Sequence, residues 1–190
     1  RLQVDVIYTD LTKAFDKVHH CILLKKLQRF GFCASLVSLL KAMVMNRFQY
    51  VEYNGYKSRE FSCNSGVAQG SNLGPLLFII FFNDICEYIN SKFFVYADDL
   101  KLIKFINSSS DCYDLQDSID SFVKYCSINC LVINKSKCKI MSITRKTNLI
   151  NYNYNINGNV LERCNQFRDL GVIIDTKLSF VPHIEYLYYK

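Results

Sequence analysis

The stretch that decides the fold is Phe93-Phe94-Val95-Tyr96-Ala97-Asp98-Asp99-Leu100, an apolar run that meets two adjacent aspartates before apolar residues resume. Such runs predict β-strands, so the pair lies at a turn between two strands. Two carboxylates about 4 Å apart repel by about 4 kcal/mol at an effective dielectric of about 20. Either one is protonated or a cation lies between them. A solvated acidic turn is the simpler alternative for an isolated Asp-Asp pair.

The composition predicts one globular domain, or one domain with a fragment of a second. Half of the 190 residues are apolar, which is enough for a core and argues against disorder. Lys and Arg number 23 against 17 Asp and Glu, and a net charge of +6 favours a polyanionic partner only weakly. The longest apolar run, Leu76 to Phe82, is far shorter than the roughly 20 residues that cross a bilayer. We expect an intracellular protein of the nucleus or cytoplasm, neither secreted nor membrane-bound.

The nine cysteines do not form a zinc or disulfide pattern. They include no Cys-x-x-Cys pair and no histidine at finger spacing, and their number is odd. Several lie in apolar helical patterns, so we expect reduced core residues.

Strands and helices alternate along the chain, which predicts an α+β fold, a sheet with helices on one face. The Asn54-Gly55 and Asn157-Gly158 pairs predict tight hairpin turns. Residues 64–75 predict a loop and residues 107–110 a helix-capping loop. The remaining expected strands are 2–9, 131–133, 139–143 and 166–175, and the expected helices are 15–30, 35–45, 76–90, 115–126 and one starting at Pro182.

Asp10 ends the first expected strand, and Asp98 and Asp99 lie between two others. If these strands are neighbours, three carboxylates meet at one edge of the sheet. Hard oxygen ligands of this kind suit Mg²⁺ or Mn²⁺. Two such ions would activate an attacking hydroxyl and stabilise a leaving phosphate.

Five motifs in order resemble the palm of a reverse transcriptase, and the most similar type is that of non-long-terminal-repeat (LINE-like) retrotransposons. The motifs are YTDLTKAFDKV (8–18), SGVAQGSNLGPLLFIIFFNDI (65–85), FVYADDLKLI (94–103), LVINKSKCKIMSI (131–143) and FRDLGVIID (167–175). The resemblance covers essentially the whole chain. It implies an RNA-directed DNA polymerase, a nucleotidyltransferase that adds a dNTP to a primer 3′-hydroxyl on an RNA or DNA template.

The same resemblance implies an architecture. Residues 1–181 would form a palm-type antiparallel sheet backed by helices, with a primer-grip hairpin near 152–175. Residues 182–190 would begin the thumb helix. The fingers that would precede Arg1 are missing and the thumb is truncated, so we expect the isolated chain to extend primers poorly or not at all.

For the reaction itself, the resemblance implies that Asp10, Asp98 and Asp99 bind two Mg²⁺ or Mn²⁺ ions. Lys137 would lie near the departing pyrophosphate. The alternative for Lys137, nearly as good an explanation, is an ordinary strand lysine whose charge is solvated. Lys135, Lys137 and Lys139 alternate, so in a strand they would share one face suited to phosphate contact.

For the nucleotide, Phe15 would be the steric gate against a 2′-hydroxyl, because a rigid ring blocks an added oxygen. A core residue packed at helical spacing is the alternative. The N–H groups of Lys13 and Ala14 would face the triphosphate at a helix N-terminus. Asp16 is expected to be structural, a first-turn acid favoured by the helix dipole.

Two further motifs would hold the nucleotide and the primer. Gln69, Gly70 and Ser71 would support the templating base and the incoming nucleotide, with a plain turn as the alternative. Leu170 and Gly171 match the primer-grip hairpin.

Three positions depart from the family pattern. Ala68 stands where proline is usual, and Cys138 where threonine is common. Asp169 stands where an aromatic residue is expected, which puts the grip on the primer in doubt.

Other interpretations stay open. A catalytically inactive remnant could still bind nucleic acid or a partner. Another palm-type enzyme, such as a nucleotide cyclase, explains the carboxylates but not the other motifs. A group II intron or retron enzyme is possible within reverse transcriptases, although GVIID after Leu170 favours the retrotransposon type.

Overall fold

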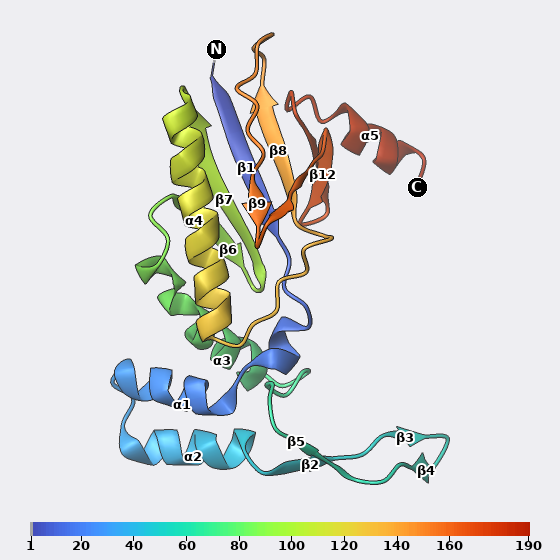
Figure 1. The fold of residues 1–190 in the computed structure, drawn as a ribbon. Helices are drawn as coiled ribbons and strands as arrows, with labels where there is room; N and C mark the ends of the chain where they lie inside the picture. Colours follow the sequence, from blue (N-terminus) through green and yellow to red (C-terminus); the bar gives the residue numbers. More distant parts are fainter. Residues whose placement is uncertain (1) are drawn as a thin grey trace. The chain divides into compact units, whose positions relative to one another are not determined.

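The computed structural model describes residues 2–190, which form two compact units. The sheet unit comprises the chain up to Leu11, Glu87–Tyr125 and Ile133–Lys190. The helical unit comprises Thr12–Cys86 and Cys126–Val132 (Figure 1).

The sheet unit contains a five-stranded sheet in the order β11-β8-β1-β7-β6. β1 is central and pairs antiparallel with both β7 and β8, β6 extends the sheet antiparallel to β7, and β11 pairs parallel with β8. The strands are β1 (Gln3–Thr9), β6 (Lys92–Tyr96), β7 (Asp99–Ile106), β8 (Lys139–Thr144) and β11 (Glu162–Arg163). β1 therefore lies in the middle of the sheet, between strands that come later in the chain.

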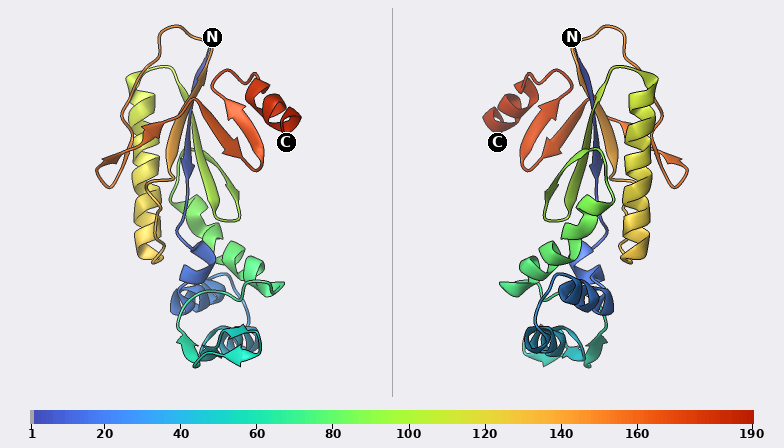
Figure 2. Two further views of the ribbon diagram at one scale, coloured as in Figure 1. Left: turned by 90° about the vertical axis from the view of Figure 1, so that its right-hand side faces the viewer. Right: turned by 90° about the vertical axis from the view of Figure 1, so that its left-hand side faces the viewer.

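The two faces of this sheet are covered differently. Helix α4 (Ser109–Ile128) lies along one face, and the hairpin of β12 (Gln166–Asp169) and β13 (Val172–Asp175) lies on the other with α5 (Val181–Tyr188) (Figure 2). The hairpin face has its own apolar cluster, with Val6, Tyr8 and Met141 buried at its centre and the neighbours Val4, Ile103, Ile143, Cys164, Phe167 and Ile174. A smaller hairpin, β9 (Asn155–Ile156) and β10 (Asn159–Val160), turns at Asn157-Gly158 as predicted.

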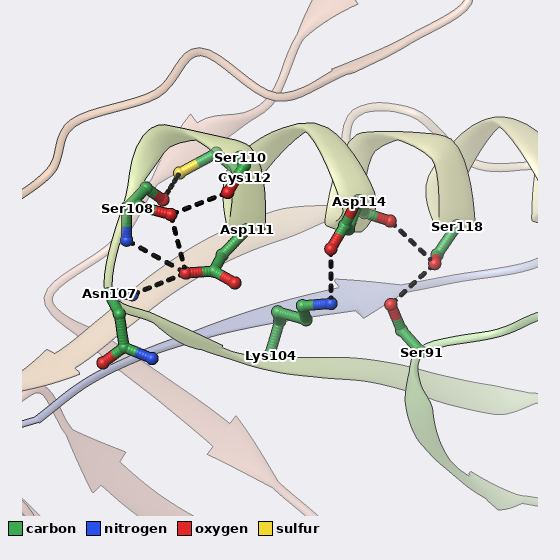
Figure 3. Close-up of polar contacts among 9 residues, drawn as sticks. All are labelled: Ser91, Lys104, Asn107, Ser108, Ser110, Asp111, Cys112, Asp114 and Ser118. Atoms are coloured by element: carbon green, nitrogen blue, oxygen red, sulfur yellow. Dashed lines mark hydrogen bonds and ion pairs between the residues drawn. The ribbon is translucent and has the colours of Figure 1, made fainter.

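Helix α4 begins with a side-chain cap. Asp111 Oδ2 accepts hydrogen bonds from the N–H groups of Asn107 (2.8 Å) and Ser108 (2.9 Å) (Figure 3). The expected capping loop 107–110 is shorter than predicted, because α4 already begins at Ser109 and the capping carboxylate belongs to the helix itself. An acid in the first turn that reaches back to these N–H groups satisfies donors the helix leaves unpaired. Further along, Asp114 forms an ion pair with Lys104 of β7 (2.8 Å), which attaches the helix to the sheet.

The helical unit contains helices α1, α2 and α3, two short 3-10 helices and a long hairpin. The hairpin turns at Asn54 (φ 49°) and Gly55 (φ 79°), as the Asn-Gly pair predicts. Inside the unit, Lys26 and Asp84 form a buried ion pair (2.6 Å) between α1 and the segment after α3. The elements are the 3-10 helices Ala14–Lys17 and Asn83–Glu87, α1 (His20–Arg29), α2 (Ala34–Val44), α3 (Leu73–Phe82), β2 (Arg47–Gln49), β3 (Glu52–Tyr53), β4 (Tyr56–Lys57) and β5 (Phe61–Cys63).

The expected single helix over 15–30 is wrong. Val18 and His19 have extended ψ angles (112° and 115°) and separate the 3-10 helix from α1. The cause is a long-range contact, because Gly66 N–H donates to Val18 O (2.8 Å) and His19 bridges to Ser65. The expected helix 76–90 also differs: α3 already begins at Leu73 and changes to 3-10 geometry after Phe82.

Two expected strands are corrected as well. Residues 131–133 form only an isolated bridge between Ile133 and Leu11. Residues 166–175 form a hairpin rather than one strand, because Leu170 (φ 46°) and Gly171 (φ 90°) reverse the chain. Consecutive residues with positive φ are what a tight hairpin turn requires.

The cysteines are free thiols, of which Cys112, Cys126 and Cys138 are buried as expected. The core placement is wrong for four exposed ones, Cys21, Cys33, Cys86 and Cys130. Within residues 2–190, none of the helices combines the length and apolarity needed to cross a membrane.

Candidate functional site

Three carboxylates gather at one end of the five-stranded sheet. The β1–β7 ladder pairs Thr9 with Leu100, so one further antiparallel step places Asp10 beside Asp99. Thr9 Oγ1 donates to Leu100 O (2.9 Å), which fixes this end of the ladder. Asp98 lies in the turn between β6 and β7, after Ala97 with its φ of 53°. We call this end of the sheet, with its three aspartates, the carboxylate rim.

The electrostatics of the rim show that its charges interact. Desolvation of its carboxyl group, followed by the charges of Asp98 and Asp10, raises the pKa of Asp99. Lys101 opposes this shift and Asp169 adds to it. Like charges disfavour one another's ionised form, so this rim would bind a cation favourably.

Lys137 forms an ion pair with a carboxylate of the rim. Its Nζ lies 3.6 Å from Asp10 Oδ1. The turn that carries it is anchored to the same aspartate, because Asn134 N–H donates to Asp10 O (2.9 Å) and Asn134 O accepts from Lys137 N–H (3.1 Å). Lys137 is 66% exposed, so the ion pair itself stabilises the fold little.

The expectation that Lys135, Lys137 and Lys139 share a strand face is wrong. Lys135 and Lys137 lie in a turn, and only Lys139 belongs to β8, where it pairs with Glu162. The turn replaces the strand because Asn134 O accepts hydrogen bonds from both Lys137 and Cys138. Cys138 is buried and its Sγ also donates to Asn134 O (3.3 Å). A threonine hydroxyl could donate in the same way, so this departure keeps the contact.

The hairpin β12–β13 faces the side of the sheet that carries Asp99. Side chains two residues apart in a strand share a face, so Asp99 and Lys101 point to the same side. Lys101 Nζ lies 2.5 Å from Asp169 Oδ1 of the hairpin. Leu170, which follows Asp169, is 55% exposed at the turn. Asp169, the third departure, therefore has a partner on the sheet that sequence reasoning missed.

The donor set of the rim fits hard divalent cations, since carboxylate oxygens are the ligands that Mg²⁺ and Mn²⁺ prefer. As the side chains stand, no three His, Cys, Asp or Glu residues within 2–190 are grouped closely enough to hold a metal ion. Asp10 is instead paired with Lys137. Metal binding by Asp10, Asp98 and Asp99 stays a prediction.

In the helical unit, the loop 64–71 is tied to the segment that follows Asp10 in sequence. Gln69 Nε2 donates to Asp16 Oδ1 (2.8 Å), Ser65 Oγ to Asp16 O (2.8 Å) and Val67 N–H to Phe15 O (3.0 Å). Asp16 lies in the first turn of the 3-10 helix as expected, and its carboxylate also accepts the hydrogen bond from Gln69. These contacts place Gln69 next to the 3-10 helix.

The other predicted nucleotide residues lie in the same two segments. Phe15 is half-buried and its ring stacks on Phe78, with centroids 4.4 Å apart. Lys13 (φ 51°) precedes a four-residue 3-10 helix that starts at Ala14, so the expected α-helical N-terminus is replaced by a tighter turn. Gly70 has φ 81°, a conformation that glycine adopts without strain.

Comparison with known families and proteins agrees with the motifs. A family model described as reverse transcriptase (RNA-dependent DNA polymerase) matches residues 5–174. The chain is 30% identical over 186 residues to the RNA-directed DNA polymerase from mobile element jockey of Drosophila melanogaster. That alignment covers 93% of this chain and 20% of that protein. It is 27% identical over 191 residues to the probable RNA-directed DNA polymerase from transposon BS of the same organism, covering 95% and 21%.

Solved structures share the fold. Apo telomerase from Candida tropicalis, truncated from its C-terminal domain, superposes with a TM-score of 0.65 at 13% identity, covering 94% of this chain and 35% of that one. The predicted α+β palm-type fold is confirmed, and so is the resemblance to reverse transcriptases of non-long-terminal-repeat retrotransposons. The chain spans about a fifth of the length of the curated relatives it matches.

Proposed function

Because the chain belongs to the reverse transcriptase (RNA-dependent DNA polymerase) family, we propose that it supplies the catalytic palm of an RNA-directed DNA polymerase. The reaction would add a dNTP to a primer 3′-hydroxyl on an RNA or DNA template. The observation that carries the proposal is the carboxylate rim, where the β1–β7 register puts Asp10 beside Asp99. In this proposal residues 1–181 form the palm, and residues 182–190, within and after α5, begin the thumb.

Asp10, Asp98 and Asp99 would hold two Mg²⁺ or Mn²⁺ ions, which when bound stabilise charge on the attacking and leaving oxygens. The primer 3′-hydroxyl would lose its proton to water, its oxygen would bond to the α-phosphorus, and the bond from that phosphorus to the pyrophosphate oxygen would break. The ammonium of Lys137, held beside Asp10, would donate a proton or a hydrogen bond to the departing pyrophosphate.

The remaining predicted residues would bind the substrates. The backbone N–H groups of Lys13 and Ala14 would contact the triphosphate, and the Phe15 ring would exclude a 2′-hydroxyl. Gln69 and Gly70 would support the templating base and the nucleotide. The primer would contact Leu170 and Gly171, at the turn of the β12–β13 hairpin.

The test is Mg²⁺-dependent primer extension by a protein that contains this chain and extends to the length of its relatives. Asp98→Asn should reduce extension by at least about a hundredfold, because it removes a carboxylate that would hold the metal ions. Asp117→Asn, on the exposed surface of α4, is the matched control and should extend normally.

Extension that survives Asp98→Asn would sink the role given to Asp98. Salt-dependent binding of a primer–template by the unaltered protein, without extension, would instead favour the inactive nucleic-acid-binding remnant.

A further inference from the structure

The hairpin β12–β13 is fastened to the five-stranded sheet at three levels. At its base, Thr144 N–H of β8 donates to Thr176 O (2.9 Å). In its middle, the rings of Tyr8 and Phe167 stack with centroids 3.8 Å apart and planes inclined by 16°. Near its turn, Lys101 pairs with Asp169 at 2.5 Å.

The third contact joins the two parts of the proposed polymerase site. Lys101 follows Asp99 by two residues on β7 and shares its face of the sheet. Asp169 ends β12 and directly precedes Leu170 at the turn. One ion pair therefore links the strand that carries a rim carboxylate to the strand that carries the hairpin turn.

The pair is shielded from solvent more than an ordinary surface ion pair. Both side chains are 15% exposed, whereas Asp114, on the opposite face, is 59% exposed in its pair with Lys104. Removing one partner of a shielded pair leaves an uncompensated charge, which is far more costly than losing an exposed pair. The hairpin would then move so that the remaining charge reaches water.

The turn itself needs an external constraint. Leu170 has φ 46°, a left-handed conformation that is unfavourable for a residue with a Cβ, and its side chain is 55% exposed. Strained residues of this kind persist only where surrounding contacts hold them. The ion pair at the adjacent Asp169 is such a contact.

We propose that Lys101 and Asp169 are positioning residues, which hold the β12–β13 turn at a fixed place relative to the carboxylate rim so that a primer end is presented to it. This inference rests on the proposed polymerase function.

The experiment compares Lys101→Met, Asp169→Asn and the charge swap Lys101→Asp with Asp169→Lys. Lys104→Met is the matched control, because it removes a lysine of the same strand from an ion pair on the other face. Amide hydrogen exchange of the chain reports on residues 166–175, with β1 as internal reference. Steady-state primer extension by the longer protein gives KM for the primer–template and kcat.

We expect both single variants to speed exchange in residues 166–175 by about tenfold or more, with β1 unchanged. The KM for the primer–template should rise by about tenfold while kcat changes less than about threefold, because a misplaced turn weakens primer binding. The charge swap should restore both readouts, and Lys104→Met should alter neither.

Unchanged exchange in both single variants would overturn the inference, and so would a charge swap that restores nothing. Faster exchange with an unchanged KM would show a tether that does not position the primer, and the inference would also fail. If the unaltered longer protein neither binds nor extends a primer–template, the proposed function is wrong and the positioning role fails with it. The exchange data would still decide whether the pair fastens the hairpin.

Discussion

Phe15 and Phe78 stack with their ring centroids 4.4 Å apart and their planes inclined by 22°. Phe78 is fully buried, and Phe15 is only half-buried, so one face of the Phe15 ring is packed while the rest of the side chain stays accessible. A stacked ring has few alternative rotamers. Phe15 can therefore support the core of the helical unit and still serve as a rigid barrier.

The first prediction is that Phe15→Ala has two separate effects. It should lower the free energy of unfolding by about 2 kcal/mol, below the 3–5 kcal/mol typical of a fully buried phenylalanine. In the longer protein it should also lower the preference for dNTP over rNTP by about tenfold or more. Denaturant unfolding and competitive incorporation measure the two effects. Tyr53→Ala, at a 76% exposed hairpin residue, should change neither. Loss of stability with unchanged selectivity would show that Phe15 is a core residue and not a steric gate.

The second prediction concerns Gly66, which has φ 86° and lies against the backbone of Asp16. A Cβ at this position would lie 2.9 Å from Asp16 Cα, so Gly66→Ala must strain the φ angle and also push two segments apart. We expect a loss of about 3 kcal/mol in unfolding free energy. Gly31→Ala, with φ 82° but open space around it, should cost only about 1 kcal/mol. Equal losses in the two variants would show that the close approach to Asp16 does not matter.

The third prediction separates turnover from stability at Lys137. Because this side chain is 66% exposed, Lys137→Ala should change the free energy of unfolding by less than about 0.5 kcal/mol. Turnover in primer extension should fall by about tenfold to a hundredfold, since a proton donor to the leaving group is lost. Lys135→Ala, in the same turn, is the control and should keep full turnover. A Lys137 variant that turns over normally would remove this residue from the reaction.

The fourth prediction is a pH dependence that comes from the cap of α4. Hydrogen bonds from the N–H groups of Asn107 and Ser108 lower the pKa of Asp111 below its ordinary value. A depressed carboxyl pKa means that the stabilisation is fully present above the ordinary value of about 3.9 and is lost as the pH falls through the folded value.

Asp111→Ala should therefore melt a few degrees below the unaltered chain at pH 7, and the difference should shrink as the pH falls below about 4. Thermal unfolding followed by circular dichroism measures it. Asp117→Ala, on the same helix beyond its first turn, should show no such pH-dependent gap. A gap that persists unchanged in acid would contradict the cap.

The local turns could be predicted from the sequence because they depend on residues that tolerate positive φ. Asn54-Gly55 and Asn157-Gly158 both form the predicted hairpin turns. The carboxylate rim could be predicted because Asp10 directly follows the end of β1 and Asp99 lies at the start of β7.

Features set by distant contacts could not be predicted. The break at Val18 exists because Gly66, far along the chain, donates to its carbonyl. The hairpin at Leu170 is implied only by the family resemblance, because it requires a leucine at positive φ, which no local preference favours. The partner of Asp169 depends on which β7 lysine faces the hairpin, and this becomes visible only once the register is known.

The central place of β1 in the sheet also constrains how the protein matures. β1 is translated before both strands that flank it in the sheet, β7 (Asp99–Ile106) and β8 (Lys139–Thr144). Pairings so distant along a chain form slowly. Until β8 emerges, the backbone N–H and C=O groups along one edge of β1 stay unpaired, so nascent chains are most vulnerable to aggregation during that interval.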